Sequence, residues 1–203
     1  MVRIPGGSFT FGEPTPSESW HQPGQVVELG AYCMDRFEFP NVRGQRPRAS
    51  ASWTQAEEEC RAGGKRLCSS MEWERACEGP EGQRYVYGPT RDASICNTPI
   101  EGGGPGKGRR PPYSGGGDFP QCLSAEGVYD LNGSMSEWVS DPWTGAPEPF
   151  NSEAIVDPAT WRTLRGGTMW SHTFYGQDCT SRHGHPTSFQ NMDDGFRCCS
   201  DPS

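Results

Sequence analysis

Nine cysteines constrain this chain more than any other feature of its sequence. The 203 residues contain no CxxC pair and no cysteine–histidine pattern with zinc-finger spacing, so disulfides explain the cysteines better than structural zinc does. An odd number leaves one cysteine unpaired or bonded to another chain. Because disulfides persist in oxidising compartments, the sequence predicts an extracellular, periplasmic or cell-surface protein.

The abundance of glycine and proline disfavours a compact fold, and cross-links would compensate for this. The chain has 27 glycines and 19 prolines, and only 32% of its residues are hydrophobic, a composition that otherwise favours disorder. Seven tryptophans and nine cysteines oppose disorder, since large aromatic side chains bury much area and cross-links restrict the unfolded chain. With no internal repeat, residues 1–203 are predicted to form a single domain.

The net charge disfavours some classes of partner. Eighteen basic and 26 acidic residues give −8, which disfavours nucleic acid and anionic membranes and is compatible with bound cations. No apolar run is long enough to span a membrane. The first residues, Met1-Val2-Arg3-Ile4, do not resemble a signal region, so we expect any export leader to lie outside this sequence.

Two short helices are predicted from their capping residues. Thr54 is expected to begin the first, with Glu57 as capping-box partner, and Ser69 the second, with Glu72 in that role. Glycines are expected to end both helices. Strands are expected at residues 26–29, 32–34, 163–169 and 195–199, with a turn and strand at 127–138. Residues 101–118, rich in Gly, Pro and basic residues, are predicted to be a surface insertion.

A series of short motifs follows a fixed order along the chain. They are Ser52-Trp53-Thr54-Gln55-Ala56, Gly64-Lys65-Arg66-Leu67, Glu72-Trp73-Glu74-Arg75-Ala76-Cys77, Gly127-Val128-Tyr129-Asp130, Gly133 with Glu137-Trp138, Arg165-Gly166-Gly167 and Gly195-Phe196-Arg197-Cys198. Their order and spacing resemble the formylglycine-generating enzyme, or sulfatase-modifying factor, family. The resemblance covers nearly the whole chain. It implies an α+β fold, a variant of the C-type lectin fold with few helices, small twisted sheets, long loops and several disulfides.

The same resemblance implies two disulfides, Cys60–Cys198 and Cys77–Cys179. Five cysteines remain: Cys33, Cys68, Cys96, Cys122 and Cys199. Cys96 and Cys122 flank the Gly-rich insertion, where a bridge would pin its two ends, and Cys33–Cys199 is a further predicted pair. One of the five is left over.

A structural calcium site is also implied by the resemblance. Its ligands here would be the side chains of Asp130 and Glu137 and the main-chain carbonyls of Gly133 and Met135, all hard oxygen donors of the kind calcium prefers. Alternatively, the two carboxylates cap the turn by accepting main-chain N–H groups. A second family calcium site would begin at Asn97-Thr98, but residues 101–118 contain no recognisable second half.

The residues expected to bind copper in this family are absent. Family members oxidise a cysteine of a sulfatase substrate with copper(I), which is held by two thiolates shortly after the Gly-Gly-Ser motif. Ser171 and Gly176 occupy those positions, and neither can replace the thiolates that soft copper(I) selects. We therefore predict no bound copper, no formylglycine synthesis and no catalytic residue.

The segment after the Gly-Gly motif is instead rich in aromatic and polar side chains typical of recognition surfaces. The candidate binding residues are Trp170, His172, Phe174, Tyr175, Gln177, Asp178 and His183. The arrangement also resembles that of retroelement-diversified ligand-binding proteins, which place variable residues in this part of the same scaffold. Alternatively, these aromatic residues only pack the long loops.

The sequence thus favours a secreted or surface-exposed, calcium-stabilised, non-catalytic binding domain with an unknown protein or small-molecule ligand. Two rival hypotheses remain. One is a copper or non-haem iron oxidase or oxygenase with ligands among His172, His183 and His185. The other is a structural module of a larger extracellular assembly, joined through the odd cysteine.

Overall fold

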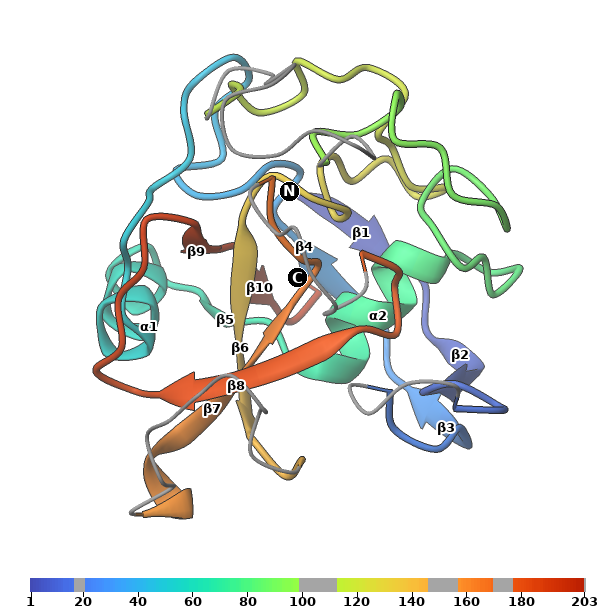
Figure 1. The fold of residues 1–203 in the computed structure, drawn as a ribbon, viewed down its shortest axis with the longest axis horizontal. Helices are drawn as coiled ribbons and strands as arrows, with labels where there is room; N and C mark the ends of the chain where they lie inside the picture. Colours follow the sequence, from blue (N-terminus) through green and yellow to red (C-terminus); the bar gives the residue numbers. More distant parts are fainter. Residues whose placement is uncertain (17–20, 99–112, 146–156, 170–176, 203) are drawn as a thin grey trace.

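The computed structural model describes residues 1–16, 21–98, 113–145, 157–169 and 177–202. Within these ranges the chain forms two four-stranded sheets, a two-stranded hairpin and two α-helices (Figure 1). Few helices, small sheets and long connecting loops confirm the predicted α+β class.

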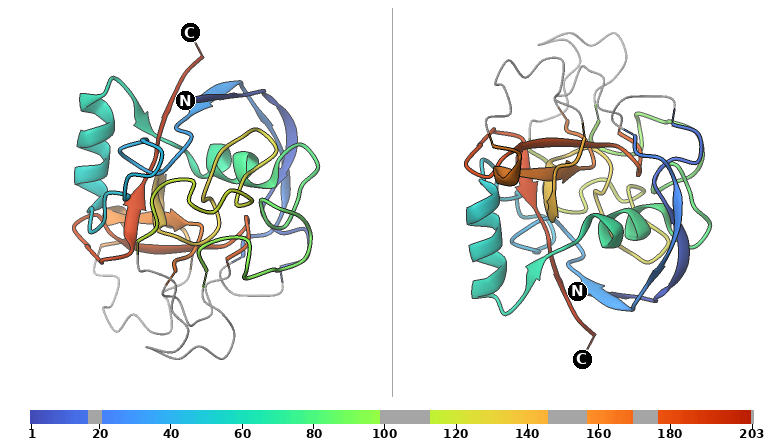
Figure 2. Two further views of the ribbon diagram at one scale, coloured as in Figure 1. Left: turned by 90° about the horizontal axis from the view of Figure 1, so that it is seen from above. Right: turned by 90° about the horizontal axis from the view of Figure 1, so that it is seen from below.

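The first sheet joins the two ends of the chain. Its order is β1 (Val2–Ile4), β4 (Tyr32–Met34), β10 (Cys198–Ser200) and β5 (Arg66–Leu67), with every neighbouring pair antiparallel. Because the first and last strands of the chain belong to this one sheet, both termini lie on the same side of the molecule (Figure 2).

The second sheet has the order β8 (Arg182–Pro186), β7 (Trp161–Arg165), β6 (Ser136–Pro142) and β9 (Asp194–Phe196). The β6–β9 pair is parallel and the other two pairs are antiparallel. The sheet therefore brings the Glu137-Trp138 motif directly beside the closing Gly195-Phe196 segment.

The remaining strands, β2 (Gly7–Phe11) and β3 (Gln25–Leu29), form a separate hairpin that contacts the second helix. The 3₁₀ turn η1 (Pro158–Thr160) precedes β7.

Helix α1 (Trp53–Ala62) begins two residues earlier than predicted. Its N-cap is Ser52, whose hydroxyl accepts the Gln55 N–H at 3.3 Å, while the Gln55 side chain accepts the Ser52 N–H at 3.1 Å. The prediction of Thr54 as the cap was wrong, because Gln as well as Glu can complete a capping box. Thr54 lies instead in the first turn.

Helix α2 (Ser70–Glu78) has the predicted capping box between Ser69 and Glu72. It ends at Gly79, whose φ of 66° is a conformation that glycine adopts without strain. The face that it turns to the core carries Trp73, Ala76 and Cys77, each at most 1% exposed, as predicted.

Two apolar clusters pack on the opposite faces of the first sheet. Tyr32 and Met34 belong to the cluster that includes α2, whereas Leu67 and Cys198 belong to the one beside α1. Successive residues of a strand point to opposite faces, so Cys198 and Cys199 enter different clusters.

Four disulfides link the chain. Cys60–Cys198, Cys77–Cys179 and Cys96–Cys122 are present as predicted. The first two join residues 138 and 102 positions apart, which restricts the unfolded chain strongly.

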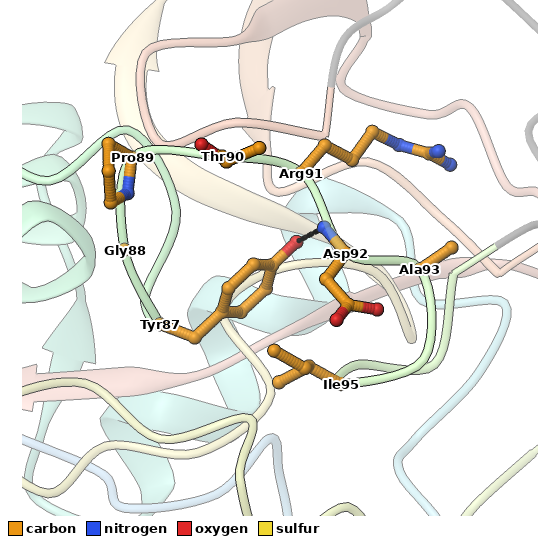
Figure 3. Close-up of a pocket in the computed structure, with 8 residues that line it drawn as sticks. All are labelled: Tyr87, Gly88, Pro89, Thr90, Arg91, Asp92, Ala93 and Ile95. Atoms are coloured by element: carbon orange, nitrogen blue, oxygen red, sulfur yellow. Dashed lines mark hydrogen bonds between the residues drawn. The ribbon is translucent and has the colours of Figure 1, made fainter.

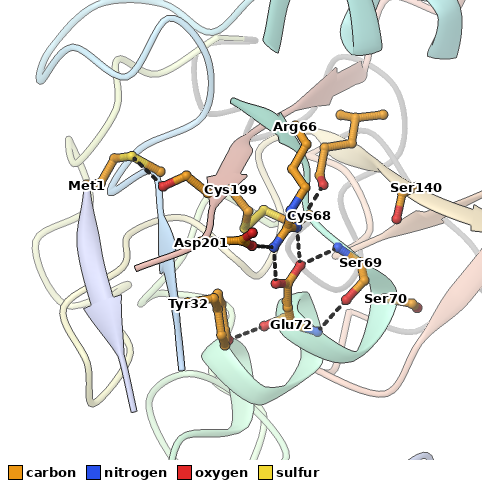
Figure 4. Close-up of polar contacts among 12 residues, drawn as sticks. Met1, Tyr32, Arg66, Cys68, Ser69, Ser70, Glu72, Ser140, Cys199 and Asp201 are labelled. Carbon is orange, nitrogen blue, oxygen red and sulfur yellow. Dashed lines mark hydrogen bonds and ion pairs between the residues drawn. A yellow bond between two sulfur atoms is a disulfide. The ribbon is translucent and has the colours of Figure 1, made fainter. Parts of the chain in front are cut away.

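The predicted Cys33–Cys199 bridge was wrong, because Cys199 bonds to Cys68 and Cys33 is free. The register of β4 against β10 pairs Cys199 with Met34, and Cys33 with Ser200. Cys33 and Cys199 therefore face opposite sides of the sheet. Figure 4 shows the Cys68–Cys199 bridge.

The end of the predicted surface insertion is not at the surface. Residues 99–112 lie outside the described part, but Gly115, Gly116 and Gly117 are buried. A Cβ on Gly115 would lie 2.3 Å from the Gly44 carbonyl oxygen, and one on Gly116 would lie 3.0 Å from Phe37. Glycine here permits close backbone packing, which composition alone cannot distinguish from loop flexibility.

Candidate functional site

A buried ion pair lies between the second sheet and α2. Arg197 donates from Nε and Nη2 to the two carboxylate oxygens of Glu137, each at 2.6 Å, and Trp73 Nε1 donates to Glu137 at 2.8 Å. All three side chains are at most 1% exposed. The Arg197 guanidinium also donates to the main-chain carbonyls of Asp35 and Tyr129.

Glu38 belongs to the same cluster and was missed by sequence reasoning. Its carboxylate accepts the Met135 N–H and the Ser134 hydroxyl, both at 3.0 Å. Burial raises its pKa well above the usual range, and the negative charges of Glu137 and Asp130 raise it further. The only signal in the sequence is an acidic residue between two phenylalanines.

Asp130 completes the group from an unusual backbone conformation. Its φ is 62°, and its carboxylate accepts the Gly117 N–H at 2.7 Å. Burial raises the pKa of Asp130 to about 6, although the hydrogen bond from Gly117 and the charge of Arg197 oppose this shift. The bond from Gly117 is of the kind that the turn-capping alternative predicts.

Three buried carboxyl groups thus lie near one guanidinium, which pairs with Glu137, while burial raises the pKa of the other two. A hard cation bound beside Asp130 and Glu137 would favour their ionised forms, although both oxygens of Glu137 already accept hydrogen bonds from Arg197 and Trp73. Among the described residues, however, no three His, Cys, Asp or Glu side chains converge as metal ligands. A calcium ion here would therefore depend on the main-chain oxygens of Gly133 and Met135 beside Asp130 and Glu137.

Asn97 and Thr98 are buried beside the same turn. The Asn97 carbonyl accepts the Ser134 N–H at 2.9 Å, and a Cβ on Gly133 would lie 2.4 Å from that carbonyl oxygen. Gly133 has a φ of 78°, so only glycine fits there without strain. The structure therefore places Asn97 and Thr98, where a second calcium site was expected to begin, against the turn that contains Gly133.

The predicted binding segment is only partly described. Trp170, His172, Phe174 and Tyr175 lie outside the described residues, as do Ser171 and Gly176. Gln177 is described: its side chain donates to the Thr168 carbonyl at 3.0 Å, and its own carbonyl accepts from Asn132 at 2.7 Å. These contacts fix the end of the segment against the core.

Asp178 is an interior residue, which disagrees with its predicted place on a recognition surface. It is 2% exposed and accepts hydrogen bonds from Arg84 and Ser181. Burial alone would raise its pKa, but bonds from His21 and Ser181 and the charges of His21 and Arg84 lower it to about 2. Asp178 is thus an ionised structural carboxylate.

His183 is also buried, on β8. Burial, together with the neighbouring His185, lowers its pKa to about 3, and burial lowers that of His185 to about 4. The ring of His185 stacks on Phe189 with centroids 3.9 Å apart. Both histidines are therefore neutral and packed at physiological pH.

All nine cysteines lie in the described part of the chain. Eight form the four disulfides, and Cys33 on β4 is the single free thiol. No helix in the described ranges has the length and apolar character needed to cross a membrane.

This arrangement of small sheets, two helices and long loops is that of the C-type lectin-like domains. The family described as sulfatase-modifying factor enzyme 1-like domain matches residues 39–202, and the chain belongs to this family. The mouse formylglycine-generating enzyme is 28% identical over 178 residues, which cover 78% of this chain and 45% of that protein. The enzyme from Thermomonospora curvata is 28% identical over 180 residues, covering 79% of this chain and 57% of that protein.

The chain spans about half the length of these curated relatives. Among solved structures, PvdO from Pseudomonas aeruginosa has a TM-score of 0.67 at 17% identity, with 99% of this chain and 94% of that chain covered. Treponema denticola variable protein 1 has a TM-score of 0.69 at 18% identity, with 100% and 95% covered. These similarities extend the shared fold over the whole chain.

Proposed function

We propose that this chain is a non-catalytic binding domain of the sulfatase-modifying factor family. The main support for the proposal is the number of free cysteine thiols. Copper(I) held in the manner of this family requires two thiolates, whereas eight of the nine cysteines are consumed in disulfides and only Cys33 remains. Cys33 lies on β4, remote in sequence from positions 171 and 176.

The proposed ligand is a protein or small molecule outside the cell. Four disulfides support an oxidising compartment, and a disulfide-bonded scaffold holds its loops in place for recognition. The fold is shared with a protein described as a variable protein of Treponema denticola.

The activity test compares this protein with the mouse formylglycine-generating enzyme. Both are loaded with copper(I) and given a cysteine-containing sulfatase peptide, and mass spectrometry follows conversion of the cysteine to formylglycine. We expect conversion by the mouse enzyme and none by this chain. Conversion by this chain would overturn the proposal.

The rival metal-dependent oxidase is tested with the same preparation. Elemental mass spectrometry after exposure to copper(I) or iron(II) should find neither metal retained. Stoichiometric metal that is lost in His172→Ala, His183→Ala or His185→Ala, but kept in a His21→Ala control, would support the rival.

We further propose that calcium binds at Asp130, Gly133, Met135 and Glu137. The excess of buried carboxylates over arginine supports this assignment. Calcium at about 100 times its dissociation constant should stabilise the fold by about 2.7 kcal/mol.

Thermal unfolding with calcium or chelator measures this effect. Asp130→Asn should abolish the calcium-dependent shift, whereas Glu28→Gln, at an exposed position of β3, should retain it. An equal shift in the two variants would place the calcium elsewhere.

A further inference from the structure

The loop after α2 lines an open surface pocket at which no site was predicted. Its cavity of about 620 Å³ is lined by residues 87–95 except Ser94. Figure 3 shows the ring of Tyr87 directed toward the main chain of Asp92, with Ile95 below the ring in this view. Cavities of this size are common for small-molecule sites.

The loop is held in shape by its own contacts. Tyr85 and Gly88 exchange two main-chain hydrogen bonds, of 2.9 and 3.0 Å. The Asp92 N–H donates to the Tyr87 hydroxyl at 3.2 Å, and the Cys96–Cys122 bridge fixes the following residue. A pocket that is formed in advance loses less conformational entropy on binding.

The floor of the pocket is apolar. The half-buried ring of Tyr87 stacks on Tyr85, with centroids 5.4 Å apart and planes within 10°. Pro89, Ala93 and Ile95 add aliphatic surface around it. A ring supported from behind by a second ring offers a rigid flat surface at little entropic cost.

The rim is polar and carries both charges. Thr90, Arg91 and Asp92 are exposed and supply a hydroxyl, a guanidinium and a carboxylate. The Asp92 carboxylate also accepts the N–H and O–H of Ser94, at 2.8 and 2.6 Å, and these bonds orient it.

Adjacent opposite charges disfavour an ionic ligand of either sign, because an anion would meet Asp92 and a cation would meet Arg91. A hydroxyl group both donates and accepts, so it can bond to each of the three rim side chains. The C–H face of a sugar ring packs well on a tyrosine ring.

We propose that the pocket formed by residues 87–95 binds a neutral saccharide unit. This inference rests on the proposed binding function and names its site and ligand class. The contacts would be the Tyr87 ring below the sugar and Arg91 and Asp92 at its hydroxyl groups.

The test is a titration of the whole chain with a panel of neutral mono- and disaccharides, followed by saturation-transfer NMR and calorimetry. We expect binding of at least one sugar, and a loss of about tenfold or more in affinity in both Tyr87→Ala and Arg91→Ala. Arg43→Ala is the matched control, since Arg43 is also exposed and lies over the Tyr129 ring. It should bind like the unmodified chain.

If thermal unfolding shows that Tyr87→Ala does not fold, the sugar affinity of Arg91→Ala alone tests the inference. Failure of the whole panel to bind, or equal affinity in Arg91→Ala and Arg43→Ala, would overturn the inference. Preferential binding of a charged ligand in this pocket would also overturn the assignment of the ligand as a neutral saccharide. These failures leave the proposed non-catalytic function standing, since it is tested separately by formylglycine formation and metal content.

Discussion

The cluster around Arg197 and the pocket at residues 87–95 use charged residues in opposite ways. In the cluster, Glu38, Asp130 and Glu137 are buried and their oxygens accept hydrogen bonds from the protein. In the pocket, Arg91 and Asp92 are exposed on a loop that its own main-chain bonds support. The fold therefore depends on the first group of charges and should tolerate changes in the second.

This difference explains how a chain can keep a family fold without the family's copper ligands. Arg197 and Glu137 belong to the motifs that carry the resemblance, and both act in the interior. The segment that would hold copper is not needed to complete this ion pair or any of the four disulfides. Serine and glycine at positions 171 and 176, where the resemblance predicts copper thiolates, are thus compatible with retention of the fold.

Removing the arginine from the cluster should have the largest effect. Arg197→Met leaves three carboxylates buried without their guanidinium, and breaking a buried pair in this way costs about 3–5 kcal/mol. Urea unfolding should show this loss or a failure to fold. Arg91→Met in the pocket should change the free energy of unfolding by less than about 0.5 kcal/mol. A similar loss of stability in both variants would contradict the difference proposed between the buried cluster and the exposed pocket.

Removing the Cys68–Cys199 disulfide, which was not predicted from the sequence, should have the second largest effect on the free energy of unfolding. The double variant Cys68→Ser with Cys199→Ser opens a link across 131 residues and should lower the free energy of unfolding by about 2–5 kcal/mol. Cys33→Ser should change it little, and the denatured unmodified chain should titrate as one thiol. Two or more thiols in that titration would contradict the assigned bridges.

A third prediction concerns the pH dependence of stability. Burial, followed by the charge of Glu74, raises the pKa of Glu78 to about 9. The folded chain therefore retains a proton that the unfolded chain releases near pH 4.3, so the Glu78 contribution to stability is complete below that pH and is lost as pH rises toward 9.

Urea unfolding at pH 5, 7 and 9 measures this effect. Glu78→Gln should flatten the decline and gain stability relative to the unmodified chain at pH 9. Glu81→Gln, at an exposed position of the next loop, should leave the decline unchanged. Identical profiles for the two variants would show that Glu78 titrates normally.

The smallest effect is expected in the pocket itself. Tyr87→Phe keeps the ring on Tyr85 and removes the hydroxyl that accepts the Asp92 N–H. Loss of one partly exposed hydrogen bond should cost about 0.5–1 kcal/mol in thermal or urea unfolding. A loss as large as that of Arg197→Met would show that this loop is part of the folding core.

Much of the fold was predictable because its signals are local or belong to motifs. The Ser69–Glu72 capping box, the core face of α2 and the bridges Cys60–Cys198 and Cys77–Cys179 were each expected and found. The cap of α1 was misassigned because Ser52 and Thr54, two positions apart, both suit the role, and sequence alone does not choose between them.

The candidate site was less predictable. Asp130 and Glu137 were expected in one cluster, but Glu38 joins them from a segment about a hundred residues away. Asp178 and His183 have the composition of a recognition surface yet are buried, because the same side chains serve either role once partners are supplied by the surrounding structure.

The sequence by itself determined the family, the α+β class, the two helices and most of the cysteine pairs, because these follow from residue type and spacing or from the resemblance that the motifs carry. Tertiary structure decided the partner of Cys199, the burial of Gly115–Gly117 and the open pocket beside Tyr87. Each of these depends on which face of a strand or loop meets a distant segment. Strand alternation fixes that face only after the register is set.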